Sequence, residues 1–264
     1  MSGPLGRSVD DLELMLRTTL TVGAFNGIPG AALPTSDGPP DPKDLRIAVW
    51  ADEAMAKVSA GCRDAVTGFA AKLEEAGALV RDDVRPSIGP DHLFSTYLTL
   101  LWPIVGAGLP DPVWHDLDRW ARSAAADDVS AIAPRLMTAS HKAWLKADSL
   151  RAKIAASWAQ IFENYDAMIM PVAPTTAFAH NTEDEYIDRV VDVDGEERPY
   201  MDTLFWAGLA TAPGLPSVAV PAGAVDGLPV GVQIVGPKYG DFGLLDAART
   251  ICDVAGAAFQ APPS

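Results

Sequence analysis

The stretch from Gly214 to Pro237, GLPSVAVPAGAVDGLPVGVQIVGP, constrains the fold more than any other part of the sequence. It contains two apolar runs, over residues 217–221 and 230–235, and an Asp226-Gly227 pair between them. Short runs rich in β-branched residues predict strands, and an Asp-Gly pair predicts a turn or loop. The stretch therefore predicts two short buried strands separated by a loop.

The rest of the chain alternates between strand-like and helix-like patterns. Strands are predicted over 45–50, 78–84 and 166–171, and the last has no polar alternation, so we expect it to be buried on both faces. Helices are predicted over 52–76, 201–210 and 242–254, and over a segment that opens at Ser8 and Asp11, a capping-box-like pair, and ends at Gly23. The order strand, helix, strand over 45–84 predicts a right-handed parallel crossover, and the alternation favours an α/β fold with a mixed sheet.

The other segments carry weaker patterns. Residues 90–165 are mainly helical, with interruptions predicted at Pro103, Pro110, Pro112 and Pro134, and apolar residues from Leu136 to Ile161 follow one face of a long helix. Residues 27–44 are an irregular connection rich in proline and glycine, and residues 181–199 are an acidic insertion with a turn at Asp194-Gly195. We expect one domain, residues 1–264, in four parts: 1–44, 45–89, 90–165 and 166–264.

Composition limits the classes of partner. The 264 residues are 48% hydrophobic and carry a formal net charge of −15, so phosphate backbones and anionic lipid surfaces are disfavoured as partners. No apolar run approaches the roughly 18 residues of a membrane span, and no secretory signal precedes the first helix. Cys62 and Cys252 each lie in a helix-like segment and are interpreted as small buried apolar residues. We expect a cytoplasmic protein with no nucleic-acid or membrane partner.

The sequence contains no complete local catalytic motif. Neither a Gly-x-Ser-x-Gly elbow nor a Ser-x-x-Lys pair occurs. Ser217 is interpreted as a strand-start serine bonded to backbone, because no base lies near it in sequence. Ser149, Lys153 and Ser157 follow one another at helical spacing and are interpreted as a solvated face. His180 follows an apparent strand end and is a candidate for reaching a pocket.

Metal and cofactor motifs are also missing from the sequence. His92, His115, His141 and His180 share no metal-binding spacing, and no glycine-rich phosphate motif occurs. The acidic run DVDGE at 192–196 resembles a calcium loop only faintly, because the first and last ligand positions would be Val190 and Met201. We expect no metal site and no cofactor.

Four segments, in order along the chain, resemble the C-terminal half of the amidase signature family of serine hydrolases. They are GPLGRSVDDL at 3–12, PKDLRIAV at 42–49, YDAMIMPVAPT at 165–175 and FWAGLATAPGLP at 205–216, and the last leads into the hairpin stretch described above. The four segments are spread along essentially the whole chain. The resemblance implies a mixed β-sheet flanked by helices, present here as an incomplete, C-terminal half of the amidase fold.

The resemblance also implies a mechanism that this chain cannot complete. In the family, a lysine takes a proton from a serine held in a cis peptide, and that serine activates the nucleophilic serine. Backbone N–H groups of a glycine-rich turn stabilise the oxyanion. The Gly-Gly-Ser-Ser segment and the upstream lysine have no counterpart in these 264 residues. We therefore expect no catalytic residue here, and no hydrolysis without an N-terminal half.

The resemblance implies that the C-terminal half supplies one wall of the acyl pocket. The candidate residues are Trp206, Thr211, Gly214, Leu215, Gln233 and Ile234. For Trp206 and Leu215 the alternative is core packing, and for Gln233 it is hydrogen bonding to backbone at a sheet end. The expected partners are a small-molecule amide once the domain is complete, and either an N-terminal amidase half or another copy of the chain.

Three hypotheses remain open at this level. The chain is a truncated or split amidase, or a non-catalytic binding or interaction module derived from one, or an independent hydrolase with a site around Ser217 and His180. The absent catalytic segments favour the first two.

Overall fold

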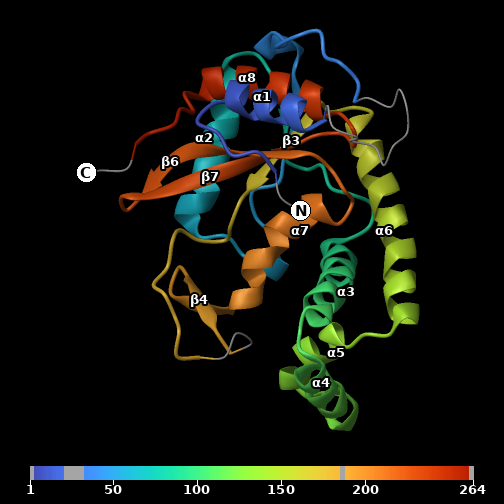
Figure 1. Cartoon of the computed structure of the whole chain (residues 1–264). Coiled ribbons are helices and arrows are strands. Elements are labelled where there is room, and N and C mark those ends of the chain that lie inside the picture. The colour runs from blue at the N-terminus through green and yellow to red at the C-terminus, as the bar shows by residue number, and fades with distance from the viewer. Residues whose placement is uncertain (1–2, 21–32, 185–187, 262–264) are drawn as a thin grey trace.

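A computed structural model describes residues 3–20, 33–184 and 188–261 of the chain. A five-stranded sheet lies at its centre, with the order β2-β1-β3-β7-β6 (Figure 1). The strands are β1 (Arg46–Val49), β2 (Leu79–Arg81), β3 (Ala167–Pro171), β6 (Ser217–Val225) and β7 (Leu228–Val235). β1 pairs in parallel with β2 and β3, whereas β7 is antiparallel to β3 and β6. The mixed α/β sheet expected from the sequence is confirmed.

Helices cover both faces of this sheet. The helices of the first face are α1 (Val9–Leu20), α2 (Ala60–Glu75) and α8 (Asp241–Ala255), of which α1 lies against the outside of α8 (Figure 1). The helices of the second face are α3 (Pro90–Ala107), α6 (His141–Phe162) and α7 (Phe205–Thr211). Two further helices, α4 (Asp111–Ser123) and α5 (Ile132–Met137), lie beyond the end of α3 and away from the sheet. No helix in the described ranges is long and apolar enough to cross a membrane.

Helix α1 begins where its capping residues predict. Ser8 Oγ accepts a hydrogen bond from the backbone N–H of Asp11, and the Asp11 carboxylate accepts one from the N–H of Arg7. Arg249 of α8 forms ion pairs with Asp10 and Glu13, which fasten the helix to the rest of the fold. The predicted helix end at Gly23 lies outside the described residues, as does part of the 27–44 connection.

The helix predicted over 52–76 begins eight residues later than expected. The Asp52 carboxylate accepts hydrogen bonds from the N–H groups of Glu53 and Val58, and this arrangement holds an irregular loop with a short 3₁₀ turn at Ala54–Ala56. Ser59 then donates its N–H to the carbonyl of Pro174, 2.7 Å away, and α2 starts at the next residue. The prediction was wrong because a side chain and a distant carbonyl take up N–H groups of this segment.

Four other boundaries also differ. The strand predicted over 78–84 is only the three residues of β2. Pro103 does not interrupt α3, which packs against α5 and α6 and keeps its course despite the missing N–H. Leu136 belongs to α5 rather than to the long helix, because Ser140 caps a separate α6 by accepting from the N–H of Ala143. The segment 201–210 begins as a 3₁₀ turn (Tyr200–Leu204) before α7.

The two hairpins differ in how well the sequence predicted them. The turn at Asp194-Gly195 is confirmed between β4 (Val190–Val193) and β5 (Glu196–Pro199), with φ of 57° and 80° at its two residues. The β6–β7 hairpin is longer than predicted, and Asp226 and Gly227 form a tight turn rather than a loop. β6 is also not fully buried, because every second side chain near its start is exposed.

Candidate functional site

Gln233 lies at the centre of the region where the acyl-pocket wall was predicted. The residue is only 5% exposed. Its Nε2 donates to the carbonyl oxygens of Pro171, at 2.8 Å, and Trp206, at 2.9 Å, and its Oε1 accepts from Ser217 Oγ at 3.2 Å. One amide thus joins the end of β3, helix α7 and the start of β6, and uses both its donor and its acceptor capacity.

Trp206 belongs to a buried aromatic cluster beside Gln233. The residue is 0% exposed, and its ring meets that of Trp50 edge to face with 6.0 Å between centroids. Trp50 stacks in turn on Trp158 at 6.5 Å. The indole N–H groups of Trp158 and Trp206 are buried without a hydrogen-bond partner in the described part of the chain. Trp50 differs, because its indole N–H donates to the carbonyl of Asp52 at 3.1 Å. Trp158 and Trp206 are therefore held mainly by aromatic packing.

The segment after α7 forms a tight turn that leads into β6. Gly214 donates its N–H to the carbonyl of Thr211 at 3.1 Å, and Leu215 donates to Ala210 at 3.0 Å. Gly214 has φ +72°, a conformation in which a side chain would be strained. The Thr211 hydroxyl donates to the carbonyl of Ala207 at 2.8 Å, so its Oγ proton is engaged within the helix.

The structure brings five of the six predicted wall residues into one region. Trp206, Thr211, Gly214 and Leu215 lie along α7 and its turn, and Gln233 is bonded to α7 through the carbonyl of Trp206. Ile234 lies apart from them. Successive strand residues point to opposite faces, and Ile234 is 0% exposed in the cluster formed with α2 and α8.

Ser217 and His180 are placed at different sites. Ser217 bonds to the Gln233 side chain and not to backbone, which corrects the interpretation made from sequence. A neutral amide cannot act as the base that a serine nucleophile needs. His180 lines a separate surface pocket of about 280 Å³ with Phe178 and Tyr200, and Ser217 is not among its lining residues.

The other candidate nucleophiles are also engaged or unreactive. Ser149 Oγ donates to the carbonyl of Leu145 at 2.9 Å, beside an exposed Lys153. Ser157 is buried and accepts from the N–H of Ile88, so the solvated-face interpretation was wrong for this residue. Burial raises the pKa of the Cys252 thiol to about 11, which keeps it protonated near neutral pH. Within the described ranges, no three acidic, histidine or cysteine side chains form a metal-binding group.

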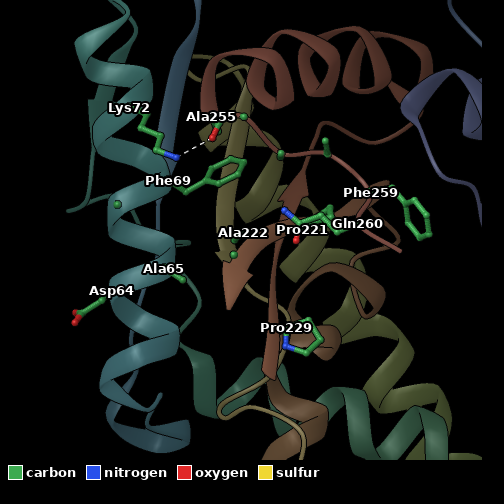
Figure 2. A pocket seen from close by; sticks show the side chains of 15 residues that line it. Asp64, Ala65, Phe69, Lys72, Pro221, Ala222, Pro229, Ala255, Phe259 and Gln260 are labelled. Atoms are coloured by element: carbon green, nitrogen blue, oxygen red, sulfur yellow. Dashed lines mark hydrogen bonds between the residues drawn. The ribbon is translucent and has the colours of Figure 1, made fainter. Parts of the chain in front are cut away.

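A groove of about 450 Å³ lies between α2, the β6–β7 hairpin and the segment after α8 (Figure 2). Phe69 and Pro221 contribute apolar surface, and the polar side chains are Asp64, Lys72 and Gln260. Lys72 Nζ donates to the carbonyl of Ala255 at 2.8 Å, the bond drawn in Figure 2. None of the described residues that line this groove is a serine, threonine, cysteine or histidine, so it offers no hydroxyl, thiol or imidazole for acyl transfer.

Comparison with protein families identifies the family of this chain. The model of the amidase family, described as "Amidase", matches residues 1–245. The chain belongs to the amidase signature family. This identification agrees with the resemblance seen in the four sequence segments.

This amidase-family chain is similar both to a relative by sequence and to solved structures by fold. It is 37% identical over 107 residues to a subunit of the glutamyl-tRNA(Gln) amidotransferase of Streptococcus uberis, covering 39% of this chain and 19% of that protein. Its fold is similar to a bacterial aryl acylamidase of the amidase signature family, with a TM-score of 0.69, 19% identity, and coverage of 96% of this chain and 52% of that one. The corresponding glutamyl-tRNA(Gln) amidotransferase subunit of Thermotoga maritima matches with a TM-score of 0.65, 20% identity, and coverage of 94% and 51%.

Each match covers a larger share of this chain than of the protein it is compared with. The chain spans about half the length of these solved amidase structures, and its alignment with the streptococcal relative spans about a fifth of that protein. Almost all of this chain therefore has a counterpart in the solved structures, whereas about half of each of those chains has none here.

Proposed function

We propose that this chain provides the C-terminal part of an amidase, which converts a carboxylic amide and water to a carboxylate and ammonia or an amine. The match of the amidase family model to residues 1–245 is the observation that carries this proposal. The Gln233-centred region supports it, because a buried amide that is hydrogen-bonded through both its nitrogen and its oxygen gives a rigid boundary on which a substrate pocket can be built.

The chain's own residues have a positioning role in this proposal. Gln233 holds the Trp206 and Pro171 carbonyls, and Thr211, Gly214 and Leu215 contribute the acyl-pocket wall beside α7. Ile234 acts only as support from the opposite face of the sheet. No residue of this chain is proposed to be catalytic, and the nucleophilic serine, cis-serine and lysine are assigned to an N-terminal half.

The proposed partners follow from the same assignment. Residues 1–264 form one partial amidase domain, whose partner is an N-terminal amidase half and whose substrate is a small-molecule amide. The streptococcal relative is by name one subunit of an enzyme, so at least one relative functions within an assembly. A cytoplasmic location remains a prediction.

An amidase assay tests the proposal. The purified chain is expected to hydrolyse p-nitroacetanilide no faster than buffer, because it lacks nucleophile, base and oxyanion donors together. In serine hydrolases, loss of the triad alone still leaves about 10³–10⁴-fold acceleration from the oxyanion hole and binding. Turnover by the chain alone that a serine-directed inhibitor abolishes would contradict the proposal.

Complementation distinguishes this proposal from the alternative, a non-catalytic binding module. Co-expression with an N-terminal half that carries Gly-Gly-Ser-Ser is expected to restore hydrolysis, and a nucleophile-to-alanine variant of that half is the control. A stable complex that binds the amide but never turns it over would favour the binding module.

A further inference from the structure

The loops after β1 and β3 lie where the connections of the sheet diverge. β1 and β3 are parallel neighbours, and Trp50 donates its N–H to the carbonyl of Ile169 at 2.9 Å. After β1 the chain turns to one side through α2 to β2, whereas after β3 it turns to the other side through α7 to β6. Such a divergence opens a crevice outside the carboxyl ends of the two strands, and ligands of α/β proteins bind in crevices of this kind. The topology therefore favours a ligand site at this edge of the sheet.

A cavity of about 510 Å³ lies beside the carboxyl end of β1. The loop after β1 contributes most of its lining, and the segment after β2 and strand β5 contribute the rest. The lining residues are Asp52, Glu53, Ala54, Lys57, Arg85, Glu196 and Arg198. The volume is within the range of about 300–1,000 Å³ that is typical of small-molecule sites. Because every lining residue except Ala54 carries a charge, the cavity suits a charged ligand.

Most of the lining charges are compensated within the chain. Lys57 and Arg198 both pair with Glu196, at 3.1 and 3.2 Å. Asp52 pairs with Arg63 at 3.6 Å, and its carboxylate also accepts two backbone N–H bonds. One cationic and one anionic side chain of the lining remain without an ion pair in the described part of the chain.

The cationic side chain is Arg85, which is held by backbone carbonyls and an aromatic ring. Its Nη1 donates to the carbonyl of Val49 at the end of β1, at 3.1 Å, and to the carbonyls of Asp82 and Val84. The guanidinium carbon lies over the ring of Trp50, 4.8 Å from its centroid. Nε and Nη2 make no hydrogen bond to the described residues, and the side chain is open to solvent. These two nitrogens form a fixed fork that matches a carboxylate.

The anionic side chain is Glu53, which lies near Arg85 without pairing with it. Burial lowers the pKa of the Arg85 guanidinium below its ordinary value, and the charge of Glu53 is the largest of those that oppose this shift. Among the described residues, the Glu53 carboxylate accepts no hydrogen bond. An uncompensated cation and an uncompensated anion therefore line the same cavity. A ligand that carries one carboxylate and one ammonium group complements both.

We propose that this cavity binds a free amino acid in its zwitterionic form, with the carboxylate on the fork of Arg85 and the ammonium group on Glu53. A simple anion fits less well, because carboxylates also line the cavity and the chain carries a net charge of −15. A simple cation fits less well, because lysine and arginine side chains line it too. Every proposed contact is made by this chain, so the inference goes beyond the amidase assignment and does not depend on it.

Ligand variants test the two contacts. Each of the common L-amino acids is titrated separately into the 264-residue chain, and binding is followed by NMR of the backbone and arginine side-chain N–H signals. At least one amino acid is expected to shift the signals of Arg85 and of residues 52–57. Its carboxamide, which lacks the carboxylate, and its N-acetyl derivative, which lacks the ammonium group, should each bind about tenfold more weakly. Binding by none of the amino acids, or equal binding by either derivative, overturns the proposal.

Protein variants test the same contacts from the other side. Arg85→Gln and Glu53→Gln should each weaken binding of the amino acid about tenfold. The matched controls are Arg81→Gln and Glu75→Gln, which change exposed charges outside the cavity lining and should leave binding unchanged. Circular dichroism and thermal unfolding first establish that each variant is folded. If Arg85→Gln does not fold, Arg85→Lys replaces it, because lysine keeps the charge but lacks the fork. Unchanged binding in a folded variant of either cavity residue, or equal weakening by the controls, overturns the proposal.

Discussion

The two faces of the central sheet are built from different side chains. The face covered by α2 and α8 has a mainly aliphatic core. Among its buried residues in the described part of the chain, the aromatic ones are Phe69 and Phe242. The face covered by α3, α6 and α7 is aromatic, with Trp50, Trp158 and Trp206 at its centre. The aliphatic layer reaches from β1 across to β6, whereas the aromatic layer leaves the start of β6 exposed.

The two layers differ in how far their packing depends on buried polar groups. Aliphatic side chains pack densely and carry no polar groups that need partners. The aromatic layer contains the buried amide of Gln233, and it stops short of the exposed residues at the start of β6. Buried polar networks specify one arrangement only when all of their members are bonded. We therefore expect the aromatic layer to be the more sensitive to substitution.

The largest expected effect is at Trp206. Trp206→Ala removes a fully buried ring between Trp50 and Phe205, and the free energy of unfolding should fall by about 3–5 kcal/mol. Urea unfolding measures it, with Leu73→Ala in the aliphatic layer as the matched control, for which about 2–5 kcal/mol is expected. If Trp206→Ala lowers the free energy of unfolding less than Leu73→Ala does, the aromatic layer is not the more sensitive of the two.

Gln233→Leu tests the buried amide with little change in volume. The carbonyls of Pro171 and Trp206 would lose their donor, and the expected loss of stability is about 1–3 kcal/mol. Ile234→Val, on the opposite face of the same strand, is the control and should cost about 0.5–1.5 kcal/mol. If Gln233→Leu is as stable as the wild type, the amide does not organise this layer.

Two glycine substitutions are expected to have opposite signs. A Cβ at Gly208 would lie 2.8 Å from Tyr97 Cδ1, so Gly208→Ala should destabilise the aromatic layer by about 1 kcal/mol. A Cβ at Gly68 in α2 would meet nothing within 4 Å, so Gly68→Ala should stabilise the chain by about 0.5–1 kcal/mol. Thermal unfolding of both variants checks the signs, and equal signs would contradict the packing described here.

The smallest expected effect is the response of α1 to acid. Hydrogen bonding to Arg249 holds the pKa of Glu13 below its ordinary value of 4.5. A lowered pKa in the folded state adds stability above pH 4.5, and this stability is lost as the pH falls through the lowered value. Hydrogen exchange should therefore show α1 loosening before the sheet on acidification. Glu13→Gln should flatten this pH dependence, and an unchanged profile would exclude Glu13 as its source.

Several features were predictable because they depend on neighbours in the sequence. The Ser8–Asp11 cap, the buried strand β3 and the turn at Asp194-Gly195 follow from residues a few positions apart. The family resemblance was equally accessible, because it depends on the order of short segments.

Only the tertiary structure decided which distant groups meet. Gln233 bonds to residues 62, 27 and 16 positions away, and no periodicity predicts those partners. The late start of α2 likewise depends on the carbonyl of Pro174, far along the chain from Ser59. Local patterns determine backbone conformation and which side chains avoid water. The meeting of a particular donor and acceptor, and the exposure of β6, depend on how the layers are stacked in space.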